Sequence, residues 1–195
     1  MIVSYGYVKQ EGDYVRELSL HILDIAQNSI EAGANTVEIT VDEDESSDLL
    51  TIRVADDGCG IPEEILKHIT DPFATSRRTR RVGLGIPLFS EAARVAGGDL
   101  EIQSGSGQGT EIKATFKISN IDRAPLGDMA ETMALLIVCN PHVDFKYEHS
   151  RGKTRFRCST GMLAKILGGM SIGSPSAVPV IRNVIREGLK HVQMT

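Results

Sequence analysis

Residues 18–34, LSLHILDIAQNSIEAGA, decide the fold because they form the pattern of one amphipathic helix with an unusual polar side. Turning by about 100° per residue, such a helix gathers its polar side chains into one narrow stripe. That stripe comprises Glu17, His21, Asp24, Asn28 and Glu31. The remaining circumference is apolar, so the helix should be mostly buried, with the stripe facing either water or a polar cavity. The helix alone leaves both possibilities open, and Gly33 suits the left-handed residue that ends it.

Downstream of this helix the pattern changes to strands. Residues 36–41 (TVEITV) alternate between polar and apolar side chains, and residues 49–55 (LLTIRVA) form a second strand-like run. The acidic segment 42–48 (DEDESSD) between them is interpreted as the turn of a hairpin. Residues 99–104 and 110–118 predict two further strands, joined by the glycine-rich segment 105–109. No helical pattern follows that segment, which excludes a dinucleotide-binding βαβ unit there.

The second strand runs into residues 56–62 (DDGCGIP), in which two glycines are separated by one residue. Glycine tolerates positive φ and lets the backbone approach a ligand closely. The aspartate directly before the first glycine, Asp57, can accept a hydrogen bond from an amino group inside a pocket. Taken by itself, an Asp-Gly turn is common in loops of every kind. Pro62 suits the first position of a short helix.

A basic, hydroxyl-rich loop follows in residues 70–87 (TDPFATSRRTRRVGLGIP). Its last glycines, Gly83 and Gly85, lead into a helical pattern over residues 88–96. A glycine turn at a helix N-terminus presents free N–H groups and the positive end of the helix dipole, which favours phosphate. The neighbouring arginines add positive charge that can approach a terminal phosphate. The alternative interpretation of this loop is a solvated surface segment.

After residue 120 the character of the chain changes. Residues 129–139 form a strongly apolar helical pattern, and residues 143–158 have the pattern of a second hairpin. Two helices are predicted, over residues 161–167 and from Ser174 onward. The basic face of the last helix, with Arg182, Arg186 and Lys190, is expected to be solvated. This α-β-β-α-α region either extends the sheet or forms a surface for a partner.

Composition places the chain among ordinary globular proteins. It has 195 residues, of which 41% are hydrophobic and 24% charged, and this suits one generous domain or a domain of about 120 residues with an appendage. The net charge of −5 gives no general case for nucleic acid or anionic membranes. Three scattered cysteines, an N-terminus unlike a signal peptide and the lack of a long apolar run predict a cytoplasmic protein.

Four features in this order resemble the GHKL superfamily of ATP-binding domains, which includes DNA gyrase, the large heat-shock chaperones, sensor histidine kinases and MutL. They are the polar helix with Asn28, the DGCG turn, the Phe-x-Thr-Ser loop with Gly-Leu-Gly, and the Gly-Thr pair at the last strand of residues 17–118. The resemblance implies a Bergerat-type α/β (α+β) two-layer sandwich, with helices on one face of a mixed, mostly antiparallel sheet. The predicted organisation is an ATP-binding domain over residues 1–120 and a small C-terminal α/β segment of unknown role over residues 121–195.

The resemblance also implies roles for individual residues, with ATP and Mg²⁺ as the ligands. Asn28 would coordinate Mg²⁺, and one neutral ligand suffices because Mg²⁺ keeps waters and takes other oxygens from the phosphates. Asp57 would accept a hydrogen bond from the adenine amino group, with Thr110 supporting it directly or through water. Gly60 would let the backbone lie against the base. The remaining nucleotide-binding positions are Gly58, Thr75, Ser76, Arg77, Gly83, Leu84 and Gly85.

Asp24 lies one helical turn before Asn28, where gyrase-like and MutL-like members carry the glutamate that activates water. A carboxylate is retained at this position, but its side chain is one methylene shorter. Positioning and charge neutralisation supply most of the catalysis in phosphoryl transfer, so the resemblance implies slow hydrolysis with Asp24 as the general base. His21, on the same stripe, is expected to line the nucleotide site or pack at its edge rather than accept phosphate.

Three functions remain open from the sequence. The first is a slow Mg²⁺-dependent ATPase that acts as a nucleotide-controlled switch, and the second is a kinase module that phosphorylates a serine or histidine of a separate protein. The third is an ATP-gated regulator without chemistry. Residues 71–76 (DPFATS) resemble the phenylalanine-containing lid of histidine kinases and so favour the second function, whereas Asp24 is compatible with the first two. A protein partner or substrate is expected, and a homodimer is allowed.

Overall fold

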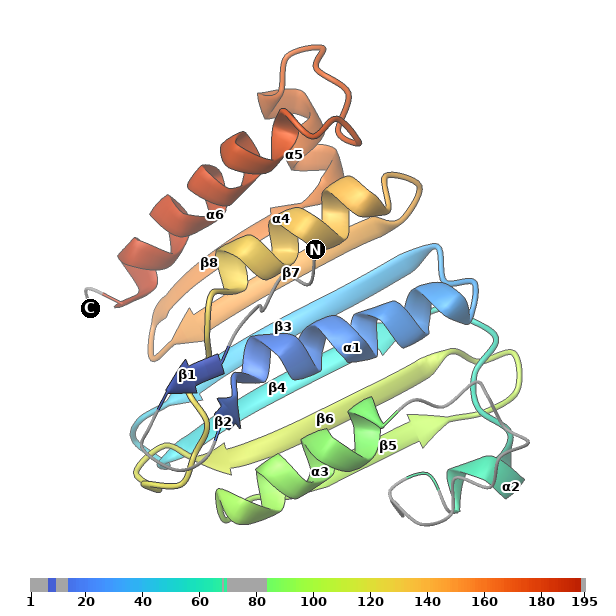
Figure 1. Cartoon of the computed structure of the whole chain (residues 1–195), viewed down its shortest axis with the longest axis vertical. Coiled ribbons are helices and arrows are strands. Elements are labelled where there is room, and N and C mark those ends of the chain that lie inside the picture. The colour runs from blue at the N-terminus through green and yellow to red at the C-terminus, as the bar shows by residue number, and fades with distance from the viewer. Residues whose placement is uncertain (1–6, 10–13, 68, 70–83, 194–195) are drawn as a thin grey trace.

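The computed structural model describes residues 7–9, 14–67, 69 and 84–193. Among these residues the main sheet has six strands in the order β5-β6-β4-β3-β7-β8 (Figure 1). They are β3 (Thr36–Asp44), β4 (Leu49–Asp56), β5 (Leu100–Ser104), β6 (Thr110–Lys117), β7 (Asp144–Arg151) and β8 (Thr154–Ser159). Strands β3 and β7 are parallel and the other neighbours are antiparallel. A separate antiparallel pair, β1 (Tyr7–Lys9) and β2 (Tyr14–Arg16), precedes the first helix.

Helices cover one face of this sheet. Figure 1 shows α1, α3 and α4 lying in front of the strands, with α6 beside α4 at the β8 edge. Within the described residues the helices are α1 (Leu18–Glu31), α2 (Glu63–Leu66), α3 (Gly85–Val95), α4 (Met129–Cys139), α5 (Thr160–Ile166) and α6 (Ala177–Gln193). None of these described helices combines the length and the apolar character needed to cross a bilayer. The predicted two-layer α/β architecture with a mixed, mostly antiparallel sheet is confirmed.

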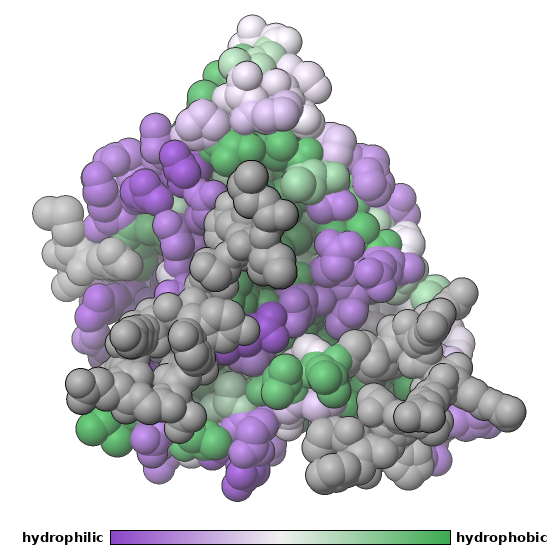
Figure 2. Space-filling model, viewed as in Figure 1, coloured by the Kyte–Doolittle hydropathy of each residue, from purple (hydrophilic) through white to green (hydrophobic). Residues whose placement is uncertain are grey.

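Strand alternation explains the two layers. Val37, Ile39 and Val41 of β3 are fully buried, whereas the side chains between them are not. The outer face instead carries ion pairs between neighbouring strands, such as Lys146 with Glu38 at 2.8 Å. Exposed ion pairs contribute only about 0–1 kcal/mol each, so the buried face holds the sheet. Figure 2 shows mostly hydrophilic residues on the helical side, as expected for helices that turn their apolar sides inward.

Helix α1 is the helix predicted over residues 18–34, and its first turn is bonded to residues 125–126, much later in the chain. It has no side-chain N-cap. Instead, the N–H of Leu18 donates to the carbonyl of Pro125 at 2.9 Å, and the N–H of Ser19 donates to the carbonyl of Leu126 at 2.8 Å. These bonds satisfy donors that every helix leaves free in its first turn. The other end closes as predicted, with Gly33 at φ 77°.

The C-terminal region extends the sheet and does not form a separate core. Strand β7 pairs with β3, and β8 pairs with β7. Helix α4 is buried on most sides, and Figure 1 shows it between α1 and α6. One hydrophobic cluster includes Ile22 of α1 together with Phe145 of β7. The predicted boundary at residue 120 therefore does not divide two cores, and the alternative that this region extends the sheet is the one observed.

Two arginines on the basic face of α6 form ion pairs with residues of the α4 N-terminus, while both side chains stay partly exposed to solvent. Arg182 pairs with Glu131 at 3.0 Å and Arg186 pairs with Asp128 at 2.9 Å. Asp128 also caps α4 by accepting a hydrogen bond from the N–H of Glu131 at 2.9 Å. Acidic groups at a helix N-terminus are favoured by the helix dipole, so α6 docks where α4 already gathers negative charge.

Candidate functional site

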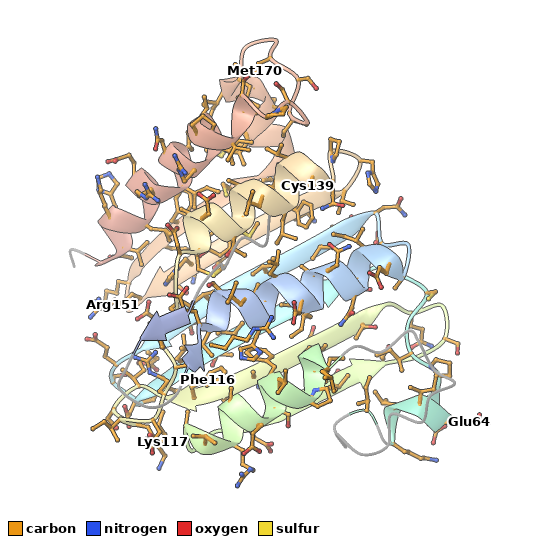
Figure 3. All side chains as sticks on the ribbon, viewed as in Figure 1. Glu64, Phe116, Lys117, Cys139, Arg151 and Met170 are labelled. Carbon is orange, nitrogen blue, oxygen red and sulfur yellow. The ribbon has the colours of Figure 1, made fainter. Side chains whose placement is uncertain are left out.

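A cavity of about 520 Å³ opens at the end of the sheet where β4 ends and β6 begins. Figure 3 shows α2, marked by Glu64, at this end of the molecule. The walls come from α1, the loop after β4, α2, the start of α3 and the hairpin between β5 and β6. The volume lies within the range of sites for small molecules, about 300–1,000 Å³.

The lining of the cavity is mainly apolar, with a few polar side chains that converge. Isoleucines supply most of the apolar surface, namely Ile25, Ile61, Ile65, Ile69, Ile86 and Ile112. The convergent polar side chains include Asn28, Ser29, Asp56 and Thr110. Apolar walls with a small number of fixed polar groups are typical of a site for a heterocyclic ligand.

Asp56 and Glu31 are the acidic residues among the described lining of this cavity, and Asp56 is the one held by hydrogen bonds on both oxygens. Its Oδ2 accepts a hydrogen bond from the buried hydroxyl of Ser29 at 2.6 Å, and its Oδ1 accepts one from the N–H of Gly58 at 2.9 Å. Hydrogen bonds to an ionised carboxylate are short and strong, so these two donors fix its orientation. Each oxygen retains further lone-pair capacity for a ligand donor. Ser29 has no place in the sequence-based site, although it follows Asn28 directly in α1.

Asp57, the residue chosen from the sequence, is not in the cavity lining. Its exposed side chain accepts hydrogen bonds through Oδ1 from the N–H groups of Asn35 at 2.7 Å and Thr36 at 2.9 Å. Those backbone donors, Thr36 first, hold the pKa of the Asp57 carboxyl below its usual range. Asp57 therefore fixes the start of β3, and Asp56, not Asp57, is the aspartate that lines the cavity. A signal for this was present, because buried Val54 lies two positions before Asp56 on the same face of β4.

The glycines of the turn allow two loops to pack without space between them. Gly60 has φ +70°, and a Cβ there would collide with the carbonyl of Gly105. The carbonyl of Cys59 accepts a hydrogen bond from the N–H of Gly107 at 2.7 Å, while the N–H of Cys59 donates to the carbonyl of Ala32 at 3.0 Å. The C-terminus of α1, the DGCG turn and the 105–109 hairpin are thus one connected wall. The sequence identified the last of these only as a hairpin loop.

Thr110 lies directly opposite Asp56 in the register of β4 and β6. Its Oγ1 is 2.9 Å from the Oγ of Ser104, which in turn accepts a hydrogen bond from the N–H of Ile61 at 2.8 Å. The structure therefore brings Thr110 into the cavity, next to the aspartate that precedes the predicted one. The Ser104 hydroxyl, which Thr110 contacts, thus ties the hairpin to the segment that leads into α2.

Asp24 lies beside the cavity rather than in its lining. It packs against the start of α3, because a Cβ added to Gly85 would lie 3.1 Å from the Cβ of Asp24. Leu84, the residue before this helix, is 58% exposed. The Oδ2 of Asp24 is 2.8 Å from an Nη2 nitrogen of Arg16, a partner that the sequence pattern did not indicate. Thus Asp24 lies against Gly85 and is paired with Arg16.

His21 packs between helices and does not line the cavity. Its ring stacks on Phe89 of α3 with centroids 5.4 Å apart and an interplanar angle of 21°. Burial, and to a smaller degree the charge of Arg16, lowers the pKa of His21 to about 4. The imidazole is therefore neutral near pH 7. Of the two expected placements, packing at the edge of the site is the one observed.

Four predicted positions, Thr75, Ser76, Arg77 and Gly83, lie outside the described residues. The structure therefore brings together Asn28, Gly58, Gly60, Gly85 and Thr110 around one end of the sheet, with Asp24 beside them. Within the part of the chain that the structure describes, no group of three or more His, Cys, Asp or Glu side chains could hold a metal ion.

Comparison with known proteins agrees with this geometry. Sporulation kinase D of Bacillus subtilis (strain 168) is 31% identical over 112 residues, which cover 57% of this chain and 21% of the relative. Sensor histidine kinase WalK of the same organism is 34% identical over 116 residues, covering 56% of this chain and 19% of the relative. The chain thus spans about a fifth of the length of these curated relatives.

A solved structure and a family model complete the comparison. The crystal structure of the N-terminal domain of a DNA repair protein shares the fold, with a TM-score of 0.52 at 13% identity over 83% of this chain and 58% of that one. Residues 14–120 match the family model described as histidine kinase-, DNA gyrase B-, and HSP90-like ATPase. This match covers more than half of the chain and includes every described wall of the cavity. The chain therefore belongs to the family of histidine kinase-, DNA gyrase B- and HSP90-like ATPases.

Proposed function

We propose that this chain binds Mg²⁺-ATP in the cavity and hydrolyses it slowly, so that the bound nucleotide controls contact with a protein partner in the cytoplasm. The observation that carries the proposal is the Asp56 carboxylate, which Ser29 and Gly58 hold in one orientation at an apolar cavity. Membership of an ATPase family supports the choice of ligand.

The adenine ring suits both kinds of surface in this cavity. Isoleucine side chains offer apolar faces for a flat heterocycle, and burying such surface is worth about 25 cal/mol per Å². An ionised carboxylate only accepts hydrogen bonds, so Asp56 would select the amino group of adenine over the carbonyl of guanine. In this proposal Asp56 takes the role that the sequence analysis assigned to Asp57. Thr110 and Gly60 keep their predicted places beside it.

The phosphates and Mg²⁺ would lie between α1 and the start of α3. Asn28 lines the cavity next to Ser29 and would give Mg²⁺ one oxygen ligand, with waters and phosphates supplying the others. When bound, the ion supplies charge neutralisation for phosphoryl transfer. Gly85 begins α3, where free N–H groups favour phosphate. The lid residues Thr75, Ser76, Arg77 and Gly83 remain part of the proposal on sequence grounds alone.

Hydrolysis would use Asp24 as the general base. It lies one turn before Asn28 and against the backbone of Gly85, so it faces the part of the site proposed for the terminal phosphate. An aspartate reaches less far than a glutamate, and a base must approach the attacking water to about 3 Å or act through a second water. We therefore expect slow turnover, with most of the rate enhancement coming from positioning and charge.

A second candidate function is transfer of the γ-phosphoryl group to a separate protein. Relatives of 31% and 34% identity that are named as kinases favour it. A third candidate, a regulator that binds ATP without chemistry, differs from both because the nucleotide would remain intact.

Binding is tested first, by thermal unfolding of the wild-type protein and of Asn28→Ala with and without Mg²⁺-ATP. The wild-type Tm should rise with the nucleotide because a ligand that binds only the native state stabilises it. Asn28→Ala should lose most of the rise, and an equal rise in the variant would remove Asn28 from the proposed metal site. ATP radiolabelled on the γ-phosphate then separates the functions. Free phosphate identifies an ATPase, label on a partner identifies a kinase, and intact bound ATP identifies the gated regulator.

A further inference from the structure

Arg16 ends β2, the strand that leads into α1 (Figure 1), two positions before the start of that helix. Its guanidinium reaches the side of the helix. Its Nη2 lies 2.8 Å from Asp24 Oδ2 and 3.5 Å from the carbonyl oxygen of Leu20. We propose that Arg16 is a positioning residue, which orients the Asp24 carboxylate and offsets its charge beside the phosphates of the bound nucleotide. This inference rests on the proposed function, because it assigns Arg16 to the same site.

The Arg16 guanidinium donates a hydrogen bond to one oxygen of the Asp24 carboxylate, Oδ2, and the described residues show no hydrogen bond to Oδ1. Oδ1 is therefore the oxygen left to accept a proton from water. Side-chain orientation matters more for an aspartate than for a glutamate here, because the shorter carboxylate has less reach to correct a misplaced rotamer.

Arg16 also offsets the negative charge of Asp24. Asp24 packs against Gly85 at the N-terminus of α3, the place proposed for phosphate. A carboxylate beside a triphosphate repels it, and the repulsion weakens nucleotide binding unless a cation is near. The two side chains are 28% and 38% exposed, so solvent screens this repulsion only in part. Arg16 supplies the compensating charge at hydrogen-bond distance.

Hydrogen bonds to a distant segment hold the backbone that follows Arg16. Leu18 and Ser19, which follow it closely, donate their N–H groups to the carbonyls of Pro125 and Leu126. Gly127 lies directly against the same turn, since a Cβ at this position would collide with Glu17 and Ser19. The guanidinium therefore extends from an anchored position, as a positioning residue requires.

The test compares Mg²⁺-ATP affinity and turnover in the full chain for four variants: Arg16→Ala, Arg16→Lys, Asp24→Asn and the double variant Arg16→Ala/Asp24→Asn. Arg16→Ala should weaken ATP binding about fivefold, the upper range for a partly exposed charge pair, and should also lower kcat. Arg16→Lys should restore affinity because it restores the charge. In the double variant affinity should return to that of Asp24→Asn, because without the carboxylate no compensation is needed.

Arg94→Ala is the matched control, since Arg94 forms an exposed ion pair with Glu91 on α3 at 2.6 Å and lies outside the site. It should leave affinity and turnover unchanged. Affinity in Arg16→Ala equal to the wild type, or no recovery in the double variant, would overturn the inference while leaving the proposed function intact. Failure of the wild-type protein to bind Mg²⁺-ATP would refute the proposed function itself. Binding without hydrolysis in the wild type would also overturn the inference, because Arg16 would then have no general base to orient.

Discussion

The hydroxyl of Ser29 donates to Asp56 Oδ2 at 2.6 Å, although the two residues are 27 positions apart. This bond joins α1 to the end of β4. The N–H of Gly58 donates to the other carboxylate oxygen, Oδ1, at 2.9 Å. A carboxylate held by two donors presents its remaining lone pairs in fixed directions. The orientation of this carboxylate therefore depends on the packing of helix against strand and not on the DGCG turn alone.

The two neighbouring aspartates give the first prediction. Asp56→Asn should abolish most of the rise in Tm that Mg²⁺-ATP causes, because it removes the charged acceptor and its bond pattern inside the cavity. Asp57→Asn makes the same chemical change one residue away and should retain the ATP-dependent rise. Asp57→Asn should lower only the free energy of unfolding, since Asp57 accepts hydrogen bonds from the N–H groups of Asn35 and Thr36. The reverse outcome, with binding lost only in Asp57→Asn, would restore the assignment made from the sequence.

Residues 18–34 could be predicted because helix periodicity and Gly33 are local signals. The sequence pattern favoured Asp57, whereas Asp56 lines the cavity, and this difference has an equally local cause. Proximity to Gly58 favoured Asp57, but the alternation of β4 buries Leu50, Ile52 and Val54 and so directs Asp56 inward. Strand register, and not turn composition, decides which of two adjacent carboxylates faces a cavity.

Other features depend on tertiary contacts that no local pattern contains. Arg16 and Asp24 meet because a strand leads into the helix at a particular angle, and their separation of eight positions matches no helical contact rule. Likewise, the sequence pattern predicted the α-β-β-α-α order of the C-terminal region, but it did not predict the parallel pairing of β7 with β3. The arginines of α6 found partners on α4 for the same reason.

The second prediction concerns the general base. Asp24→Asn should lower ATP turnover by about 10²–10⁴-fold, the usual contribution of a positioned acid or base. Affinity for Mg²⁺-ATP should remain or increase, because the change removes a negative charge beside the proposed phosphate position. Steady-state phosphate release and a separate binding titration measure the two effects. Turnover that is unchanged in Asp24→Asn would remove Asp24 from the mechanism.

The third prediction is a dependence of stability on pH through His21. Its pKa is about 4 in the folded protein and 6.5 when unperturbed, because burial and then Arg16 disfavour the charged form. Between these values the unfolded chain binds more protons, so the free energy of unfolding falls as the pH falls from about 6.5 toward 4. Urea unfolding should show a loss of about 2 kcal/mol from this group between pH 7 and pH 5.

Substitution identifies the source of that loss. His21→Leu keeps an apolar contact with Phe89 and cannot titrate, so its stability should change less over the same pH interval. His142→Ala alters an exposed histidine and should keep the wild-type pH dependence. Equal pH dependence in wild type and His21→Leu would show that His21 is not the group responsible.

The last prediction tests whether α6 belongs to the single core. Gly188 of α6 packs against the ring of Phe156 on β8, and a Cβ at this position would overlap that ring. Alanine favours a helix over glycine by about 1 kcal/mol, yet we expect Gly188→Ala to lower the free energy of unfolding by about 1–3 kcal/mol through overpacking. Gly161→Ala in α5 is the control, since no atom lies within 4 Å of its added Cβ, and it should be neutral or stabilise by about 0.5–1 kcal/mol. Urea unfolding of both variants measures the difference. If Gly188→Ala gained stability as Gly161→Ala does, α6 would not pack closely on β8, and the C-terminal helix would be free to move independently of the sheet.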